Sequence, residues 1–339
     1  MKDIPYTVQV RAGSGEDRLY ELGSSRGIPS PQTVTEEEIL LLKTAQPEKT
    51  DRVLTYGPRT GAEEVILSDQ VRNGSLTAAG ERPRRLLLTE YNRRKNESEN
   101  LEVMKSSDPG SDVLRKYDKA YIVGRDRPDH ILKYLLNSVS SCLKDSGDMR
   151  LVLPKQRGEK LRDFCEKLGE VSQTLHKESV SFKIEEVSTP ELDPLVLNEV
   201  SHSVRGTDVD LEVLKGVFSA SDLNRAEMLA RSTEISQDDE VLDLGCRHGE
   251  TSVFVNSLYG AETLALTRSD ICRSVASRNL GLNDVEECEA VSDDGPESIS
   301  HNSFDVCLFR PGSDNPNILT NDLQEVQRVL RPGSRVAVC

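Results

Sequence analysis

The sequence predicts two tandem, doubly wound α/β domains, and three observations point to this fold class. Short apolar runs alternate with helical segments along most of the 339 residues, which is typical of a mostly parallel sheet covered by helices on both faces. Val53–Gly61 and Val241–Gly249 agree at five of nine positions, 188 residues apart. The match continues in nearly the same register, where Tyr117–Val123 corresponds to Phe304–Phe309. A constant offset over such a length indicates an internal duplication.

Each copy follows the same order of elements. In the second copy we expect strands at Glu240–Leu244, Thr263–Leu266, Glu289–Val291, Asp305–Phe309 and Arg335–Val338, with helices at Ser269–Leu280 and Asn321–Leu330. Pro332 and Gly333 end the last helix. The first copy continues past its fifth strand with a helix over 158–168 and strands at Glu170–His176 and Ser181–Val187.

These patterns predict four segments. They are an N-terminal extension over 1–31 with one strand at Tyr6–Arg11, a first domain over 32–190, a connector over 191–215, and a second domain over 216–339 that lacks the terminal hairpin of the first. The missing hairpin leaves a sheet edge exposed unless residues 1–30 or another chain covers it. Self-association through that edge is therefore one expectation.

Composition limits the class of protein. No apolar run approaches the length of a membrane span, and the N-terminus has no apolar signal core, so we expect a cytoplasmic protein without membrane contact. The seven cysteines are scattered, and neither they nor the histidines show metal-ligand spacing, so no metal is expected. Net charge is −15, and residues 216–339 alone have 10 arginines, no lysine and 21 acids, a net −11. That half is poorly suited to non-specific nucleic-acid binding, and no DNA partner is expected.

One turn has the features of a ligand site. Gly245 and Gly249 lie between an apolar strand and a helix, and glycines there allow a ligand to approach the helix N-terminus closely. Asp243 lies at the carboxyl end of that strand, which is where doubly wound sheets bind ligands. A carboxylate in this place suits a ligand ammonium group. A tight turn without any ligand is the alternative.

Val241–Gly249 resembles the first motif of class I S-adenosylmethionine-dependent methyltransferases, and Phe304-Asp305-Val306 looks like their fourth-strand motif. Leu323–Gly333 resembles the helix and Pro-Gly segment before their fifth strand. The lead-in Gly216–Ser219, with the helical pattern over 222–230, resembles the ribosomal small-subunit RNA guanine-N2 methyltransferases. Those enzymes consist of two tandem Rossmann-like domains, the first degenerate and the second catalytic. The resemblance covers about residues 32–339.

The resemblance implies a cofactor site for S-adenosylmethionine in the second copy. By position, Asp243, Gly245 and Gly249 would line the cofactor pocket, and Phe218 would lie near its mouth. Asp293 would contact the adenine amino group, with the neighbouring Asp294 as its alternative. Thr267 stands near the place where the family has an acid for the ribose hydroxyls, so only one hydrogen bond from it is expected there.

The sequence departs from the family at the catalytic motif. N-methylating relatives have Asn-Pro-Pro-Phe after the fourth strand, whose Asn accepts from the amine, whereas this chain has Arg310 and Pro311 followed by Gly-Ser. A guanidinium has no acceptor atom, so Arg310 cannot orient an amine in that way. It could instead bind a phosphate or carboxylate of a different substrate, or be an exposed surface arginine. Arg247 replaces the middle glycine and is unfavourable beside a sulfonium unless it points away.

The first copy has drifted further, because Thr55 replaces the motif carboxylate and Pro58 interrupts the turn. Its basic residues Arg84, Arg85, Arg93 and Arg94 are candidates for RNA contacts, and a solvated loop is the alternative.

The expected function is methylation of a guanine exocyclic amine in structured ribosomal RNA. Two alternatives stay open: an inactive methyltransferase fold that binds RNA or a partner, and a methyltransferase for small molecules.

Overall fold

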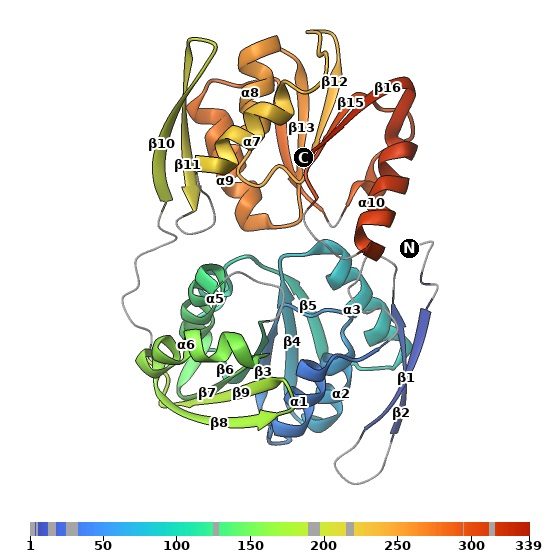
Figure 1. The fold of residues 1–339 in the computed structure, drawn as a ribbon. Helices are drawn as coiled ribbons and strands as arrows, with labels where there is room; N and C mark the ends of the chain where they lie inside the picture. The colour runs from blue at the N-terminus through green and yellow to red at the C-terminus, as the bar shows by residue number, and fades with distance from the viewer. Residues whose placement is uncertain are drawn as a thin grey trace. The chain divides into compact units, whose positions relative to one another are not determined.

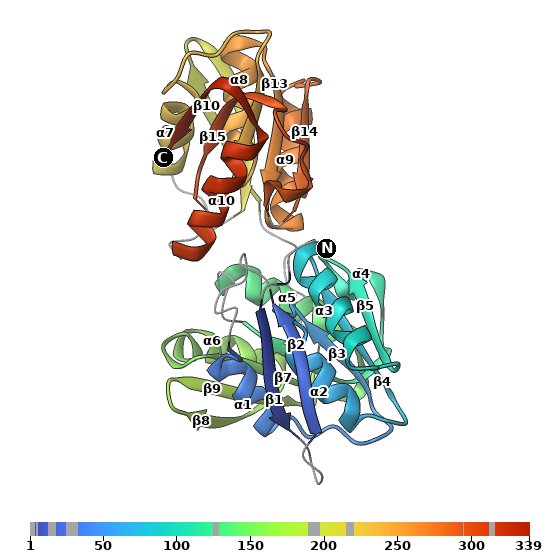
Figure 2. The same ribbon diagram turned by 90° about the vertical axis from the view of Figure 1, so that its right-hand side faces the viewer.

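The chain forms two compact units, Met1–Pro194 and Leu195–Cys339, each built on its own sheet (Figures 1 and 2). The structure, a computed structural model, describes residues 4, 6–12, 18–24, 33–124, 129–188, 197–214, 220–293, 295–311 and 316–339. No helix in this part of the chain is long and apolar enough to cross a membrane.

The N-terminal unit contains a seven-stranded sheet in the order β5-β4-β3-β6-β7-β9-β8. The strands are β3 (Arg52–Tyr56), β4 (Ser75–Gly80), β5 (Leu101–Lys105), β6 (Tyr117–Val123), β7 (Leu143–Pro154), β8 (Glu170–His176) and β9 (Ser179–Glu185). The first five are parallel, and β9 pairs antiparallel with both β7 and β8. Helices α1 (Glu36–Thr44), α2 (Ala62–Gln70) and α3 (Pro83–Lys95) pack side by side, and α5 (Asp129–Cys142) and α6 (Lys155–Leu168) form a second group (Figure 1). The short helix α4 (Pro109–Asp112) packs against α5.

The C-terminal unit repeats the first five strands in the same order, β14-β13-β12-β15-β16, all parallel. Its strands are β12 (Glu240–Leu244), β13 (Glu262–Thr267), β14 (Cys288–Ser292), β15 (Phe304–Phe309) and β16 (Leu330–Val338). Helices α7 (Ala220–Ala230), α8 (Glu250–Tyr259) and α9 (Asp270–Leu282) pack in one layer, and α10 (Pro316–Val329) packs near the short 3-10 helix Pro296–Ser298. The predicted tandem α/β fold and its internal duplication are therefore confirmed.

Both faces of the C-terminal sheet are covered, which explains why its strands read as continuous apolar runs. Successive side chains alternate between the faces. Val241 packs with α7 and α8, whereas Leu242 and Leu244 pack with Val326 and Val329 of α10.

Two β-hairpins form within the segments that the sequence predicted as an N-terminal extension (1–31) and a connector (191–215). β1 (Tyr6–Ala12) pairs with β2 (Arg18–Ser24), and Tyr20 and Leu22 of β2 enter the core of the N-terminal unit. β10 (Leu197–Val204) pairs with β11 (Thr207–Leu214) within the C-terminal unit, although a connector was expected there. Apolar residues of β11 alternate with acids, so one face of the hairpin can pack into the core while the other remains polar.

The last strand is longer than predicted. It begins at Leu330 and includes Pro332 and Gly333, with a register shift against β15. Among the described residues, β16 pairs only with β15. Val336 and Val338 are 45% and 57% exposed, whereas Met149 and Leu151 of β7, beside β9, are fully buried. Self-association through this edge stays a prediction.

Candidate functional site

The predicted ligand turn joins β12 to α8 in an unusual backbone conformation. Gly245 and Gly249 have φ of +87° and +81°, a region that favours glycine. The Gly245 N–H donates to the Leu266 carbonyl at 2.8 Å, which ties the turn to β13. A Cβ on Gly245 would lie 2.1 Å from the Arg310 carbonyl oxygen, so packing of the protein itself already requires glycine there.

Asp243 lies at the carboxyl end of β12 and is completely buried. The Ser252 hydroxyl donates to Asp243 Oδ2 at 2.9 Å. The other oxygen, Oδ1, is buried and has no hydrogen-bond partner among the residues that the structure describes. Burial raises the pKa of Asp243 to about 7, although the positive charge of Arg310 opposes that rise. The carboxyl therefore has one oxygen fixed by α8 and one that is open to a donor.

Arg310 follows β15 and is only 6% exposed, so it is not a surface arginine. Its Nη1 bonds to Glu250 Oε1, and its Nη2 donates to the Thr251 hydroxyl at 2.5 Å. Burial lowers the pKa of Arg310, but the charges of Glu250 and Asp243 outweigh that effect and raise it. The guanidinium is thus directed at the first turn of α8. Pro311 is half-buried, and residues 312–315 lie outside the described part of the chain.

Arg247 is held away from the turn. Its Nη1 donates to Asp222 of α7 at 2.8 Å, and its side chain is 39% exposed. The neighbouring His248 is buried, and burial lowers its pKa, which favours the neutral ring. The positive charge of Arg247, which was expected to disfavour a bound sulfonium, is therefore partly balanced by Asp222 of α7.

The other predicted cofactor contacts lie at the carboxyl ends of the neighbouring strands. Thr267 ends β13 and is 6% exposed, and its Oγ1 accepts a hydrogen bond from the Ser269 N–H at 3.4 Å. Asp293 follows β14, where its N–H donates to the Thr267 carbonyl at 2.9 Å and its Oδ2 accepts from Ser298. Thr267 and Asp293 are thus brought together by the sheet. Phe218 and Asp294 lie outside the described residues.

Sequence reasoning missed the polar side chains of the first turn of α8. Glu250, Thr251 and Ser252 are all completely buried. The Glu250 carboxylate bonds to Arg310 and accepts from the His248 N–H at 3.1 Å. Three polar residues directly after Gly249 are a signal that was present in the sequence, because buried polar groups require partners.

The N-terminal unit has the same turn with its polar groups exchanged. Gly57 and Gly61 have φ of +83°, matching Gly245 and Gly249. The strand residue is Thr55 and the helix residue is Glu64, and burial raises the pKa of Glu64 to about 7. A hydroxyl on the strand and an acid on the helix thus replace Asp243 and Ser252.

The turn arginine of this unit is also paired with an acid of the preceding helix. Arg59 bonds twice to Glu38 of α1, with Nη2 to Oε2 at 2.8 Å and Nε to Oε1 at 2.9 Å. Both side chains are buried. The pair corresponds to Arg247 and Asp222 in the C-terminal unit.

The four predicted RNA-binding arginines lie on α3. Arg93 and Arg94 both bond to Glu90, which lies on the same helix. Arg85 is only 8% exposed, whereas the Arg94 side chain is 74% exposed. Arg84 is partly buried. Of these four side chains, Arg94 therefore offers the most accessible charge for a phosphate.

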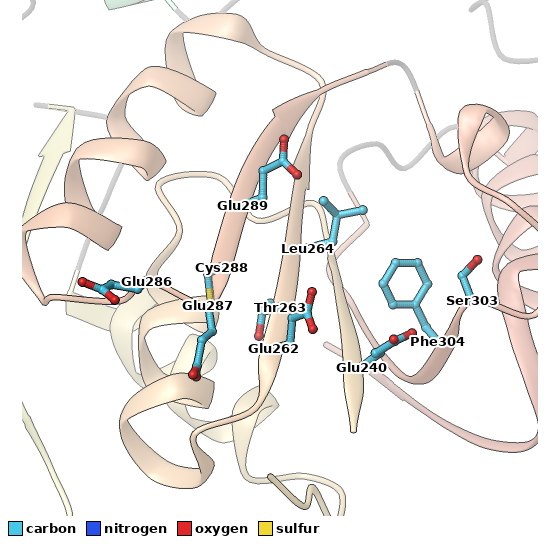
Figure 3. Close-up of a pocket in the computed structure, with 10 residues that line it drawn as sticks. All are labelled: Glu240, Glu262, Thr263, Leu264, Glu286, Glu287, Cys288, Glu289, Ser303 and Phe304. Atoms are coloured by element: carbon cyan, nitrogen blue, oxygen red, sulfur yellow. The ribbon is translucent and has the colours of Figure 1, made fainter. Parts of the chain in front are cut away.

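A separate hollow of about 400 Å³ opens at the amino ends of the strands, away from the turn (Figure 3). Its lining includes Glu240, Glu262, Glu286, Glu287 and Glu289. Glu240 is bonded to Arg331. Within the described ranges, no group of three or more His, Cys, Asp or Glu residues could hold a metal ion.

One family model matches a part of the C-terminal unit. Residues 208–338 match the model of the methyltransferase small domain family. No curated protein matches the chain.

A particular solved structure resembles the whole chain. It is the 16S rRNA N2 G1207 methyltransferase RsmC of T. thermophilus in complex with AdoMet and guanosine. The TM-score is 0.69 at 18% identity, and the match covers 98% of this chain and 88% of that one. Precorrin-6y C5,15-methyltransferase of Geobacter metallireducens matches with a TM-score of 0.40 at 18% identity, over 48% of this chain and 93% of its own. The match shows a shared fold along nearly the whole chain.

Proposed function

We propose that this chain is an S-adenosylmethionine-dependent methyltransferase of the tandem type, with a guanine exocyclic amine in structured ribosomal RNA as its expected target. The main support is Asp243, a fully buried carboxylate with a free oxygen at the carboxyl end of β12, beside the glycine turn. A buried charged group without a partner is costly unless a ligand completes it. The RsmC structure, which contains AdoMet and guanosine, supports the proposal through its fold.

The residues present fit this cofactor in part. Asp243 would bind its ammonium group, Thr267 one ribose hydroxyl and Asp293 the adenine amine, while Gly245 and Gly249 shape the turn through their positive φ. When bound, the cofactor supplies an electrophilic methyl group. The chain contributes binding and exclusion of water, because direct methyl transfer needs no enzyme nucleophile.

RNA contact would come from the N-terminal unit, with Arg84, Arg85, Arg93 and Arg94 as its candidates. The C-terminal unit has a net negative charge and no lysine after Gly216, so it is poorly suited to phosphates. A cytoplasmic location and the absence of DNA and membrane partners belong to the same proposal.

A second candidate is a methyltransferase fold without catalysis that binds RNA or a protein partner. The burial of Arg310 against Glu250 favours it, because Arg310 and Pro311, which directly follow β15, have no side-chain acceptor for an amine. A methyltransferase for small molecules is the third outcome to be tested, since the C-terminal unit is acidic.

Calorimetric titration with S-adenosylmethionine tests the proposal first. We expect binding by the wild type and a loss of affinity of about 10-fold or more in Asp243→Asn, because a charge-assisted hydrogen bond is removed. Asp305→Asn is the matched control, since Asp305 lies on β15 and bonds to Arg331 instead. No detectable heat at millimolar ligand would eliminate both enzymatic functions.

Transfer of a tritiated methyl group then separates the candidates. Labelled small-subunit RNA supports the proposed activity, and digestion to nucleosides identifies whether guanine N2 is modified. Label in a small-molecule pool favours the third candidate. Cofactor binding without any transfer favours the non-catalytic protein.

A further inference from the structure

The guanidinium of Arg310 is fixed on two sides by α8. Nη1 is paired with Glu250 and Nη2 with Thr251, both in the first turn of that helix. The Arg310 N–H also donates to the Leu244 carbonyl at 2.8 Å, at the end of β12. Arg310 is therefore held in place by the ends of β12 and β15 and by the first turn of α8.

The third nitrogen of the guanidinium, Nε, has no partner among the described residues. This nitrogen is buried, and Asp243 Oδ1 is likewise buried without a hydrogen-bond partner in the described part of the chain. Leaving a buried donor or acceptor unsatisfied costs about 1–3 kcal/mol, and more for a charged group. Two such atoms of opposite character at one site indicate that a polar ligand completes them.

Asp243 and Arg310 both lie beside the same turn. Gly245 follows Asp243 by two residues, and its Cα lies against the Arg310 carbonyl, as the 2.1 Å approach of an added Cβ shows. The charges of Arg310 and Asp243 also affect the pKa of one another. An anionic acceptor and a cationic donor therefore lie beside one glycine turn.

We propose that Arg310 binds the carboxylate of an α-amino acid group through Nε, while Asp243 binds the ammonium group of the same zwitterion. An α-amino acid has these two charges on one carbon, which matches the two unpaired atoms. Arg310 is then a ligand-binding residue that selects the amino acid end of the cofactor, in place of the amine-orienting Asn. This inference rests on the proposed function, because that cofactor ends in such a group.

Three ligands that share adenosine and a thioether test the inference by calorimetry. S-adenosylhomocysteine has the whole amino acid group, its decarboxylated analogue lacks only the carboxylate, and 5′-methylthioadenosine lacks the entire group. In the wild type, we expect loss of the carboxylate to weaken binding about 10-fold, the size of one charge-assisted hydrogen bond. This comparison needs no variant and therefore does not depend on folding.

Variants then assign the effect to Arg310. In Arg310→Met, the first two ligands should bind within about 2-fold of each other, and methylthioadenosine should bind as it does to the wild type. If that variant does not fold, the double variant Glu250→Leu with Arg310→Met removes both charges of the buried pair together. Arg335→Met is the control, since Arg335 bonds to Asp239 and the Glu234 carbonyl, and it should retain the 10-fold preference.

The outcomes separate this inference from the proposed function. Wild-type binding of none of the ligands overturns both. Binding of all three with no effect of the carboxylate overturns the role of Arg310 alone and is the result expected if a water molecule joins Nε to Oδ1. A carboxylate preference that persists in Arg310→Met overturns it as well.

Discussion

Replacing Asp243 by Asn should change how the stability of the protein depends on pH. The substitution keeps the shape of the side chain and its bond to Ser252 but removes the titrating group. Burial raises the pKa of Asp243 from its ordinary 3.8 to about 7. A group with a raised pKa contributes stability at low pH that is lost as the pH rises through the folded-state value.

The size of the effect follows from these two pKa values. The full rise corresponds to about 4 kcal/mol, of which about 2 kcal/mol is lost between about pH 5.5 and about pH 8. The wild type should therefore lose about 2 kcal/mol more than Asp243→Asn over that interval. The attraction between ionised Asp243 and Arg310 is already included in the pKa of about 7, and any cost of the substitution that does not depend on pH cancels.

Urea denaturation at the two pH values measures this difference. Far-UV circular dichroism is the suitable probe because the chain has no tryptophan, and hydrogen exchange of peptides over 240–255 assigns the change to the C-terminal unit. Asp305→Asn is the control, since hydrogen bonds from Arg331 and the Glu240 N–H outweigh its burial and lower the pKa of Asp305, so it stays ionised throughout. An equal stability difference between wild type and Asp243→Asn at both pH values would refute the reasoning.

Three further changes test the packing of the two turns, each by urea denaturation. Gly245→Ala should destabilise by about 2 kcal/mol or more, because a Cβ at φ +87° meets the Arg310 carbonyl oxygen; a loss below about 0.5 kcal/mol contradicts the close approach. Arg59→Met should cost about 3–5 kcal/mol, because it leaves Glu38 buried without a counter-charge; a loss below about 1 kcal/mol contradicts this reasoning. Burial and the neighbouring acids raise the pKa of Glu63. The Glu63→Gln variant should therefore be more stable than the wild type at about pH 8 and lose that advantage towards about pH 5. A stability advantage that does not change with pH contradicts this reasoning.

Much of the fold could be predicted because the apolar patterns are local. β12 and β8 have the predicted bounds, since each is bordered by clear turns. The β10–β11 hairpin was missed although its signal was present: polar and apolar residues alternate over Thr207–Leu214, and Arg205 and Gly206 adopt positive φ in the two-residue turn.

The candidate site could be predicted only where it depends on a local motif. Asp243 and the two glycines follow from one nine-residue segment. The environment of Arg310 could not be predicted, because its partner Glu250 lies 60 residues away in the sequence and is brought close only by the parallel pairing of β12 with β15. The same holds for Arg247, whose partner Asp222 lies on a preceding helix.

The hydroxyl and the acid have exchanged places between the two units, with Thr55 on the strand and Glu64 on the helix in one, and Asp243 on the strand and Ser252 on the helix in the other. This exchange affects how an acid in the motif is interpreted. In the C-terminal unit Ser252 donates to Asp243, whereas the Thr55 hydroxyl of the N-terminal unit has no hydrogen-bond partner among the described residues, so both arrangements are compatible with the fold. An acid at this contact is consequently no proof of ligand binding. The side of the contact that has the negative charge is more informative, because an acid at the strand end faces the position of a ligand in doubly wound sheets. In duplicated domains that have diverged, the residue at the strand end and the residue on the following helix should be compared as a pair. Such a comparison distinguishes a site whose acid has moved to the helix from a site whose acid has been lost.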